Sequence, residues 1–273
     1  MSVVAVRPHS PALALFVESL HYHDAEIPAG LERILPNGRI HLMVNLHEDE
    51  FRTYHGTDCA AVQRTHGAVL GGPHSQPTVI DTREQRRLLT VDFTLGGAAP
   101  FSTVPLSEAR DQLVELDQFW GRDGAVLRER LLEARTPEAM FGILETVLLH
   151  HLVRPRDPDP ALLFAASAFE RGVPVLEVTD RLGLLPITFV RRFRAQVGLT
   201  PKRFSRVRRL QRVLRSIADP SLADWSGMAA RHGYTDQAHL IHDFRALTGM
   251  TPAAYRPRSA TECNHVPLAA RGV

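Results

Sequence analysis

The sequence is poor in cysteine and has no long apolar run. Only Cys59 and Cys263 occur among 273 residues, and these two cannot form a disulfide framework or a metal-binding spacing. We therefore expect reduced thiols. No apolar run reaches the length of a membrane span, and the N-terminal residues carry no basic leader. The sequence predicts a soluble, cytoplasmic protein without a membrane partner.

The short motifs of common enzymes are also missing. The chain contains no glycine-rich phosphate loop, no nucleophile elbow and no cysteine–histidine pair in a recognisable context. The sequence therefore predicts no catalytic residue, no enzyme activity and no bound cofactor.

Acidic and basic residues are unevenly distributed along the chain. Residues 1–160 contain 15 Lys and Arg against 22 Asp and Glu (net −7), whereas residues 161–258 contain 16 against 7 (net +9). A basic module joined to an acidic one indicates that one half of the chain binds nucleic acid. The alternative is a charged surface that only keeps the protein in solution.

A proline-rich segment separates the two halves. Three of the eight residues 153–160 are prolines spaced by charged residues, which disfavours a helix and favours an extended linker. The sequence thus predicts an N-terminal domain over 1–152, the linker over 153–160, a second domain over 161–257 and a loose tail over 258–273.

Short apolar segments separated by glycine and proline predict strands in the first domain. They cover residues 39–46, 68–70, 78–80 and 88–95. Such punctuation is typical of a small β-sandwich or barrel.

Helical periodicity follows these strands over residues 108–119, 125–134 and 137–151. The last of the three presents a continuous apolar face. That face is either internal core or the seam of a dimer, and the sequence does not choose between the two. Strands followed by helices predict an α+β domain.

The second domain contains a repeat. Residues 193–204 read FRAQVGLTPKRF, and residues 244–255, which begin 51 positions later, read FRALTGMTPAAY. Each copy follows a turn that contains a glycine, Gly183 or Gly233, which is the order of a helix-turn-helix. Helices are expected over 161–170, 176–182, 188–196, 202–218, 225–231 and 237–248. Two copies on one chain predict a protein that binds two successive stretches of DNA.

This all-α module resembles the AraC/XylS family of bacterial transcription regulators over roughly residues 160–256. The best-matching stretch is 228–245, MAARHGYTDQAHLIHDFR, followed by Gly249, Thr251-Pro252 and Tyr255-Arg256. The resemblance implies a sequence-specific regulator with two helix-turn-helix units joined by a long helix. It implies double-stranded DNA and RNA polymerase as partners.

Two recognition helices are expected, at about 187–195 and 237–246, in successive major grooves roughly 34 Å apart. The residues expected to contact DNA are Ile187, Thr188, Arg191, Arg194, Gln237, Ala238, Ile241, His242 and Arg245. Arg191 suits guanine and Gln237 suits adenine. Asp236 is placed to cap the second helix, whereas the first unit has Leu185-Pro186 where the family usually has a serine cap.

The first domain looks like an AraC-associated N-terminal domain of undefined function, on the strength of residues 35–38, 93–98 and Trp120-Gly121. In the resembled family this position is often taken by a small cupin-like β-barrel plus helices. The resemblance implies that the domain senses a small-molecule effector or forms a homodimer. A domain that only dimerises is the alternative.

Ten histidines within residues 1–151 raise a metal alternative. His21, His23 and Glu26 resemble half of a cupin metal motif, but the carboxylate is one residue too close and the usual preceding glycine is missing. Such nitrogen and oxygen ligands bind iron, manganese or zinc. The alternative function is a cupin-type metalloenzyme with a DNA-binding appendage; otherwise these histidines are scattered over the surface.

Overall fold

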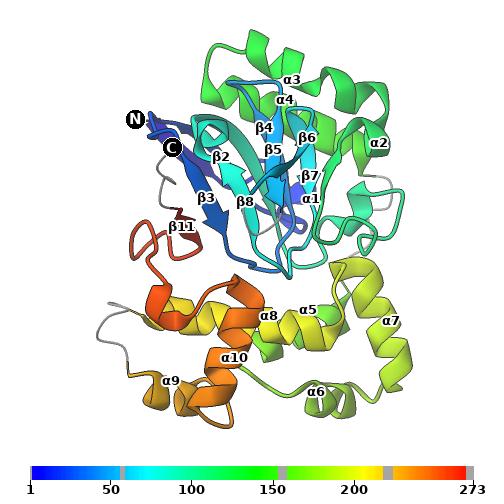
Figure 1. Ribbon diagram of the computed structural model, residues 1–273. Helices are drawn as coiled ribbons and strands as arrows, with labels where there is room; N and C mark the ends of the chain where they lie inside the picture. Colours follow the sequence, from blue (N-terminus) through cyan, green and yellow to red (C-terminus); the bar gives the residue numbers. More distant parts are fainter. Residues whose placement is uncertain (1, 56–58, 153–158, 218–223, 269–273) are drawn as a thin grey trace.

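The computed structural model describes residues 2–55, 59–152, 159–217 and 224–268. Most of the expected linker (153–158), the last residue of the helix expected over 202–218 and the end of the expected tail (269–273) lie outside these ranges. The N-terminal half, with its strands and the helices that cover them, lies above an all-helical C-terminal module (Figure 1).

The strands of the N-terminal half pair antiparallel in two sheets. The six-stranded sheet has the order β1 (Ser2–Val6), β2 (Val17–Asp24), β9 (Arg87–Phe93), β4 (His41–Asn45), β7 (Ala68–Gly71) and β10 (Leu113–Glu115). The five-stranded sheet has the order β11 (His265–Pro267), β3 (Leu31–Ile34), β8 (Thr78–Asp81), β5 (Phe51–His55) and β6 (Ala61–Thr65). The strand-rich domain is confirmed. Its described strands pair as two separate sheets and not as one closed barrel.

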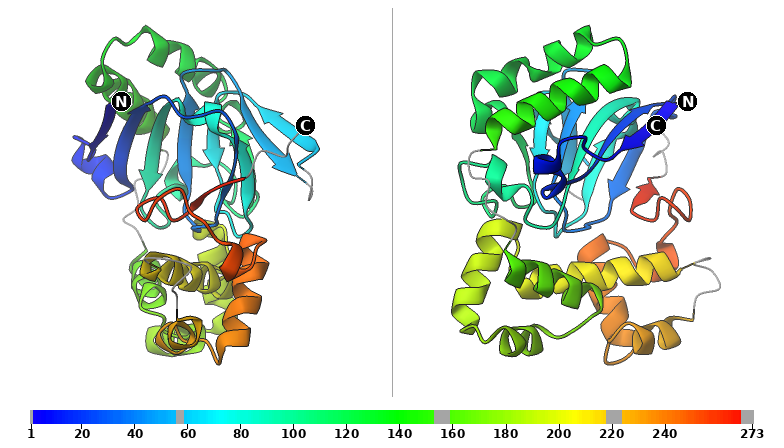
Figure 2. Two further views of the ribbon diagram at one scale, coloured as in Figure 1. Left: turned by 60° about the vertical axis from the view of Figure 1, so that its left-hand side comes forward. Right: turned by 180° about the vertical axis from the view of Figure 1, so that it is seen from behind.

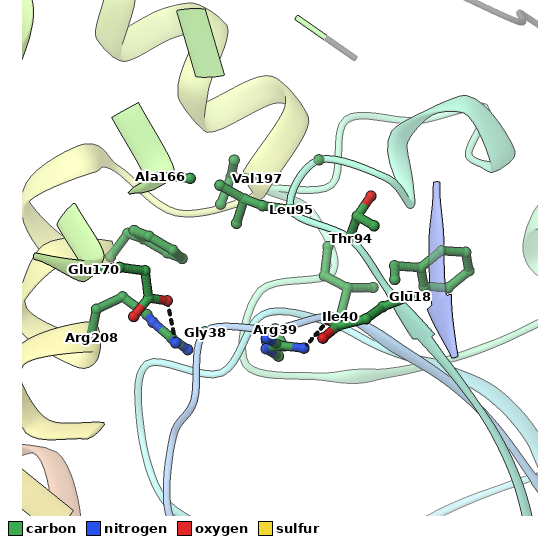
Figure 3. A pocket seen from close by; sticks show the side chains of 13 residues that line it. Glu18, Gly38, Arg39, Ile40, Thr94, Leu95, Ala166, Glu170, Val197 and Arg208 are labelled. Carbon is green, nitrogen blue, oxygen red and sulfur yellow. Dashed lines mark hydrogen bonds and ion pairs between the residues drawn. The ribbon is translucent and has the colours of Figure 1, made fainter. Parts of the chain in front are cut away.

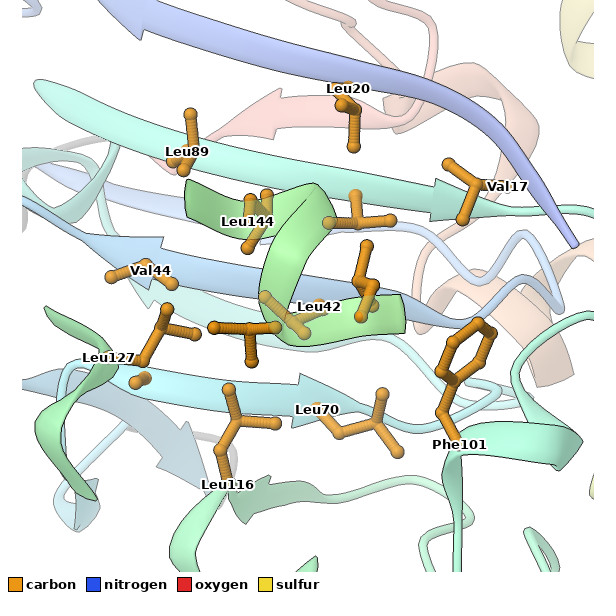
Figure 4. Packing of buried hydrophobic residues seen from close by; sticks show 14 of the residues in the cluster. Val17, Leu20, Leu42, Val44, Leu70, Leu89, Phe101, Leu116, Leu127 and Leu144 are labelled. Atoms are coloured by element: carbon orange, nitrogen blue, oxygen red, sulfur yellow. The ribbon is translucent and has the colours of Figure 1, made fainter. Parts of the chain in front are cut away.

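One face of the six-stranded sheet carries the core of this domain. Alternate residues such as Leu20, Leu42 and Leu89 are buried there under helices, as the period of two in a strand requires (Figure 4). The covering helices are α1 (Pro11–Ala14), α2 (Asp117–Trp120), α3 (Arg122–Glu133) and α4 (Pro137–His151). Leu144 and its neighbours on α4 are fully buried against the sheet. The apolar face of residues 137–151 is therefore internal core.

The helix expected over residues 108–119 is wrong. Residues 113–115 instead form β10, which pairs with β7 through Leu113 opposite Gly71 and Glu115 opposite Val69. Asp111 just before it has φ +59°, a left-handed conformation that interrupts a helix. A long-range strand pairing has overridden local helical periodicity.

The C-terminal module contains α5 (Pro160–Glu170), α6 (Val175–Leu182), α7 (Pro186–Val197), α8 (Pro201–Ser216), α9 (Trp225–Arg231) and α10 (Gln237–Thr248). Its apolar side chains form two cores, one around Phe189 and Phe193, the other around Leu240 and Phe244. α8 contributes to both cores, which makes it the connector between two helical units (Figure 2).

The segment after this module is not a loose tail over its described part. β11 pairs with β3 in the register His265 opposite Ile34, and Val266 is buried. Arg258 Nη2 and His265 Nδ1 lie 2.5 Å and 2.9 Å from Oε2 of Glu32, which is 1% exposed. A buried carboxylate needs such partners, and the returning chain supplies them.

Among the described residues, none of the helices has the length and apolar character that a membrane span needs.

Candidate nucleic-acid interface

Two helix-turn-helix units have the same local construction. α6 and α7 form the first unit, and α9 and α10 form the second. The turn of each contains a left-handed glycine, Gly183 with φ +61° or Gly233 with φ +73°. Apart from the adjacent residues, no atom of the described chain lies within 4 Å of a Cβ built on either glycine, so the conformation itself explains their presence.

The two recognition helices begin differently, as expected. The Asp236 carboxylate accepts a hydrogen bond from the His239 backbone N–H at 2.7 Å, so the predicted cap of α10 is confirmed. α7 begins after Leu185 with no side-chain cap and with Pro186 at its first position. Pro186 presets a helical φ but leaves the orphan N–H groups at the start of α7 without a side-chain acceptor.

The structure places all nine expected DNA-contacting residues on α7 and α10. Thr188 and Ile241 are half-buried, and the other seven are exposed, Ile187 to 79%. Their neighbours at helical spacing, such as Phe189 and Leu240, are fully buried. Each helix therefore turns one face to the core and the other to solvent; contact with bases stays a prediction.

The arginines of α8 mostly hold the module together. Arg206 Nε donates to Asp243 at 2.7 Å, Arg209 Nη1 donates to the Gly233 carbonyl at 2.9 Å, and Arg212 Nη1 donates to the Phe169 carbonyl at 3.0 Å. These contacts link the connector to the second unit and to α5. The basic charge of α8 is thus partly structural and not all available to phosphates.

The module is joined to the N-terminal half by polar contacts from α8. Arg208, 6% exposed, pairs with Glu170 and donates to the Asn37 carbonyl at 3.0 Å. Gln211 donates to the Pro36 carbonyl at 2.8 Å. Figure 3 shows the crevice beside this contact, about 70 Å³ in volume, with Arg208 and Glu170 on one side and Arg39 on the other.

A larger cavity of about 430 Å³ lies between the two sheets. Side chains on the face of the six-stranded sheet opposite the helices line it, from β2, β4 and β9: His21, His23, His41, Met43, Leu88, Thr90 and Asp92. The five-stranded sheet adds Phe51 and Ile80, and the segment after α10 adds Arg258, Glu262 and His265. A mostly apolar wall with a few polar groups is typical of a small-molecule site.

Two histidines share a carboxylate in this cavity. His41 Nδ1 and His21 Nε2 lie 2.7 Å and 3.3 Å from the Asp92 oxygens. Burial opposes ionisation of Asp92, but the two histidines outweigh it and hold the pKa of Asp92 well below its usual range. The hydrogen bond to Asp92 raises the pKa of His21, whereas burial lowers the pKa of His23. The Nε2 atom of His23 is buried and has no hydrogen-bond partner in the described part of the chain.

Glu84 adds a protonated carboxyl group to the same wall. It is 2% exposed, and burial raises its pKa to about 8 although Oε1 accepts a hydrogen bond from the Arg52 backbone N–H. The carboxyl group is therefore mostly neutral at pH 7 and able to donate a hydrogen bond.

The residues of the metal alternative do not come together. His21 and His23 share one face of β2, but Glu26 lies beyond the end of the strand, exposed and 3.4 Å from Arg86. Among the described residues, ligand atoms of a different group converge: Asp123 at the start of α3 with His150 and His151 at the end of α4. The metalloenzyme alternative is not favoured.

Most of the cavity residues were not predicted from the sequence. Their signal is a period of two: His21 and His23, His41 and Met43, then Leu88, Thr90 and Asp92 alternate with buried leucines and valines. This pattern shows which residues share a face but not that two sheets enclose it. The contribution of residues 258–265 had no local signal.

Family models match both halves of the chain. Residues 178–258 match the model described as Helix-turn-helix domain, and residues 5–115 match the Domain of unknown function (DUF6597). No curated protein matches the chain.

Solved structures of ToxT from Vibrio cholerae are similar to most of the chain. One at 1.65 Å resolution has 10% identity and a TM-score of 0.39, with 93% of this chain and 96% of that chain covered. A second, bound to (E)-4-(8-methylnaphthalen-1-yl)but-3-enoic acid, has 9% identity, coverage of 93% and 98% and a TM-score of 0.44.

The identity of the chain follows from the two units and the match to them. Both helix-turn-helix units are formed, one connector helix joins them, and the matched model spans the first recognition helix, the connector and the second recognition helix. Residues 178–258 form an AraC-type helix-turn-helix domain, and the chain is a DNA-binding transcription regulator.

Proposed function

We propose that α7 and α10 enter successive major grooves of one DNA face and that the nine residues predicted on them contact it. The observation that carries this proposal is that the two recognition helices have the same pattern of buried and exposed side chains. Each recognition helix buries its phenylalanines and leaves arginine and polar side chains in solvent. The target is then two short boxes about 10 bp apart.

The N-terminal domain, residues 1–152, is proposed to bind a small-molecule effector in the cavity between its sheets. Support comes from the volume of about 430 Å³ and from the polar groups Asp92, Glu84 and His23 in an apolar wall. The effector is bound and not converted. Mass spectrometry of small molecules extracted from the purified protein tests this, since a converted product in place of the added compound would favour an enzyme.

Two further partners stay predictions. RNA polymerase contact and a homodimer are implied by the family resemblance, and burial of the apolar face of α4 removes the surface that suggested the dimer. Light scattering of the full-length protein over a concentration series measures self-association directly. We place the protein in the bacterial cytoplasm, with the chromosome it regulates.

Selection of bound duplexes from sheared genomic DNA, followed by footprinting at two salt concentrations, tests the DNA proposal. Two protected boxes in adjacent major grooves are expected, with sequence preference at both. Uniform protection that falls steeply with salt would show binding through phosphates alone and would contradict direct readout.

A further inference from the structure

The 72–78 loop consists of the connection from β7 to β8 and of Thr78, the first residue of β8, and it crosses from one sheet to the other. It lies at the end of the N-terminal domain that meets the helical module. Three features of this loop, taken together, connect the effector cavity to both recognition helices.

Two prolines of the loop lie against the ends of the recognition helices. α7 ends at Gly198 and α10 at Gly249, which are equivalent positions of the repeat with φ +80° and +71°. A Cβ built on Gly198 would lie 2.5 Å from Pro73 Cγ, and one built on Gly249 would lie 3.8 Å from Pro77 Cγ. One loop therefore meets the C-terminal caps of both helices, and it is packed more tightly against the first.

The middle of the loop faces the cavity. His74 is part of the cavity wall, and its Nδ1 lies 3.3 Å from the Thr78 hydroxyl. An occupant of the cavity would lie against His74, one residue from the proline that packs on Gly198.

Asp111 holds the tip of the loop. Its Oδ1 accepts hydrogen bonds from the backbone N–H groups of Ser75 at 2.5 Å and Gln76 at 3.2 Å, and its Oδ2 accepts one from the Ser75 hydroxyl at 3.0 Å. Asp111 has a positive φ of +59°, which costs free energy in a non-glycine residue. Such strain persists where surrounding contacts maintain it, and here the contacts are those to the loop.

We propose that residues 72–78 position both recognition helices on DNA and transmit occupancy of the cavity to them through His74. The inference rests on the proposed function and adds the regulation of that site. A helix of 12 residues is about 18 Å long, so a tilt of about 5° at its cap moves its DNA-contacting end by about 1.5 Å. A small shift of one loop would thus change the separation of the two DNA-contacting ends.

The test uses the full-length protein and its selected two-box duplex, with the box separation changed by one base pair in either direction. The wild type is expected to lose about tenfold in affinity on the shifted duplexes, since each added pair rotates one box away from its helix. Asp111→Ala releases the loop and is expected to reduce this loss to about threefold or less. Affinity for a single-box duplex is expected to stay unchanged. If a folded Asp111→Ala protein loses as much affinity on the shifted duplexes as the wild type does, the proposal is overturned.

A pair of glycine variants supplies a second, independent test. Gly198→Ala and Gly121→Ala both place a Cβ at positive φ, but only the first meets Pro73 and the Leu106 carbonyl, since nothing lies within 4 Å at Gly121. Gly198→Ala is expected to make the affinity depend less on box separation, and Gly121→Ala is expected to leave that dependence as in the wild type. If the two variants show the same dependence, the proposed role of the 72–78 loop is contradicted. A protein that selects no two-box duplex at all fails the proposed function, and this inference falls with it.

Discussion

At the scale of single residues, chemistry divides the proposed DNA contacts into two kinds. Arg191 and Gln237 have planar groups that match the edges of guanine and adenine, whereas Thr188 is suited to a phosphate. The arginines of α8 that bond to Asp243 or to backbone carbonyls are already engaged within the protein. Specificity is therefore expected from a few side chains on two helices.

Arg191→Ala and Gln237→Ala are expected to relax base preference in one box each. Loss of a bidentate contact costs about 1–3 kcal/mol of discrimination. Competition binding with duplexes substituted in one box at a time measures this, with Arg171→Ala, at the residue after α5, as a control arginine outside both recognition helices. Equal weakening on every duplex would contradict base readout by these residues.

Glu84 makes stability depend on pH. Its folded-state pKa of about 8 lies above its usual value of 4.5, so the folded protein retains a proton that the unfolded chain loses across that interval. The free energy of unfolding therefore falls as pH rises from about 5 to 8. Glu84→Gln is expected to remove this contribution, as urea denaturation at several pH values would show. Glu108→Gln, at an exposed position, is the control and is expected to keep the wild-type slope.

At the scale of elements, the two recognition helices differ in how they begin. α10 has the Asp236 cap, and α7 has Leu185, which is 72% exposed and makes no side-chain cap. The two recognition helices thus bury their apolar side chains in the same pattern, but only α10 has a side-chain cap at its N-terminal end. The first unit is expected to be the more easily frayed of the two.

Asp236→Ala is expected to lower the free energy of unfolding by about 1 kcal/mol, and Leu185→Ser to raise it by up to about that amount. The serine hydroxyl would accept a hydrogen bond from an N–H of the first turn, while little apolar burial is lost. Urea denaturation of both variants checks the pair. A Leu185→Ser protein less stable than the wild type would show that the first turn of α7 does not tolerate this cap.

At the scale of the whole molecule, the chain returns to its first domain after it has built the DNA-binding module. Val266 and Leu35 share a core with Tyr255 and Phe244 of the second unit, and the Tyr255 hydroxyl donates to the Cys263 carbonyl at 2.6 Å. The second unit and the five-stranded sheet are therefore packed as one body through β11.

A chain that ends at Pro257 is expected to be destabilised by about 3–5 kcal/mol, because Glu32 keeps its buried charge and loses Arg258 and His265. Thermal or urea unfolding measures the loss. Glu32→Gln in the shortened chain removes the unpaired charge and is expected to recover part of it. No recovery would mean that strand pairing and not charge dominates.

How much of the site was predictable differs between its parts. The recognition helices were predictable because the repeat, Gly233 and the Asp236 cap are local signals, confined to one or two turns of chain. The cavity was not, because it requires β2, β4 and β9 to pair in a given register and a second sheet to cover them. The helix expected over 108–119 was wrong for the same reason, because residues 113–115 pair as an edge strand with β7, which lies about 45 residues earlier in the chain.

By itself the sequence determined a two-part chain, with an acidic strand-rich half and a basic half of two helix-turn-helix units. These follow from charge, periodicity, turn glycines and caps, which act between residues close in the chain. Only the tertiary structure decided that α4 is core, that β11 joins the first domain and that the 72–78 loop meets Gly198 and Gly249. Those contacts join segments as much as 230 residues apart, and each depends on burial that exists only once the whole chain has folded.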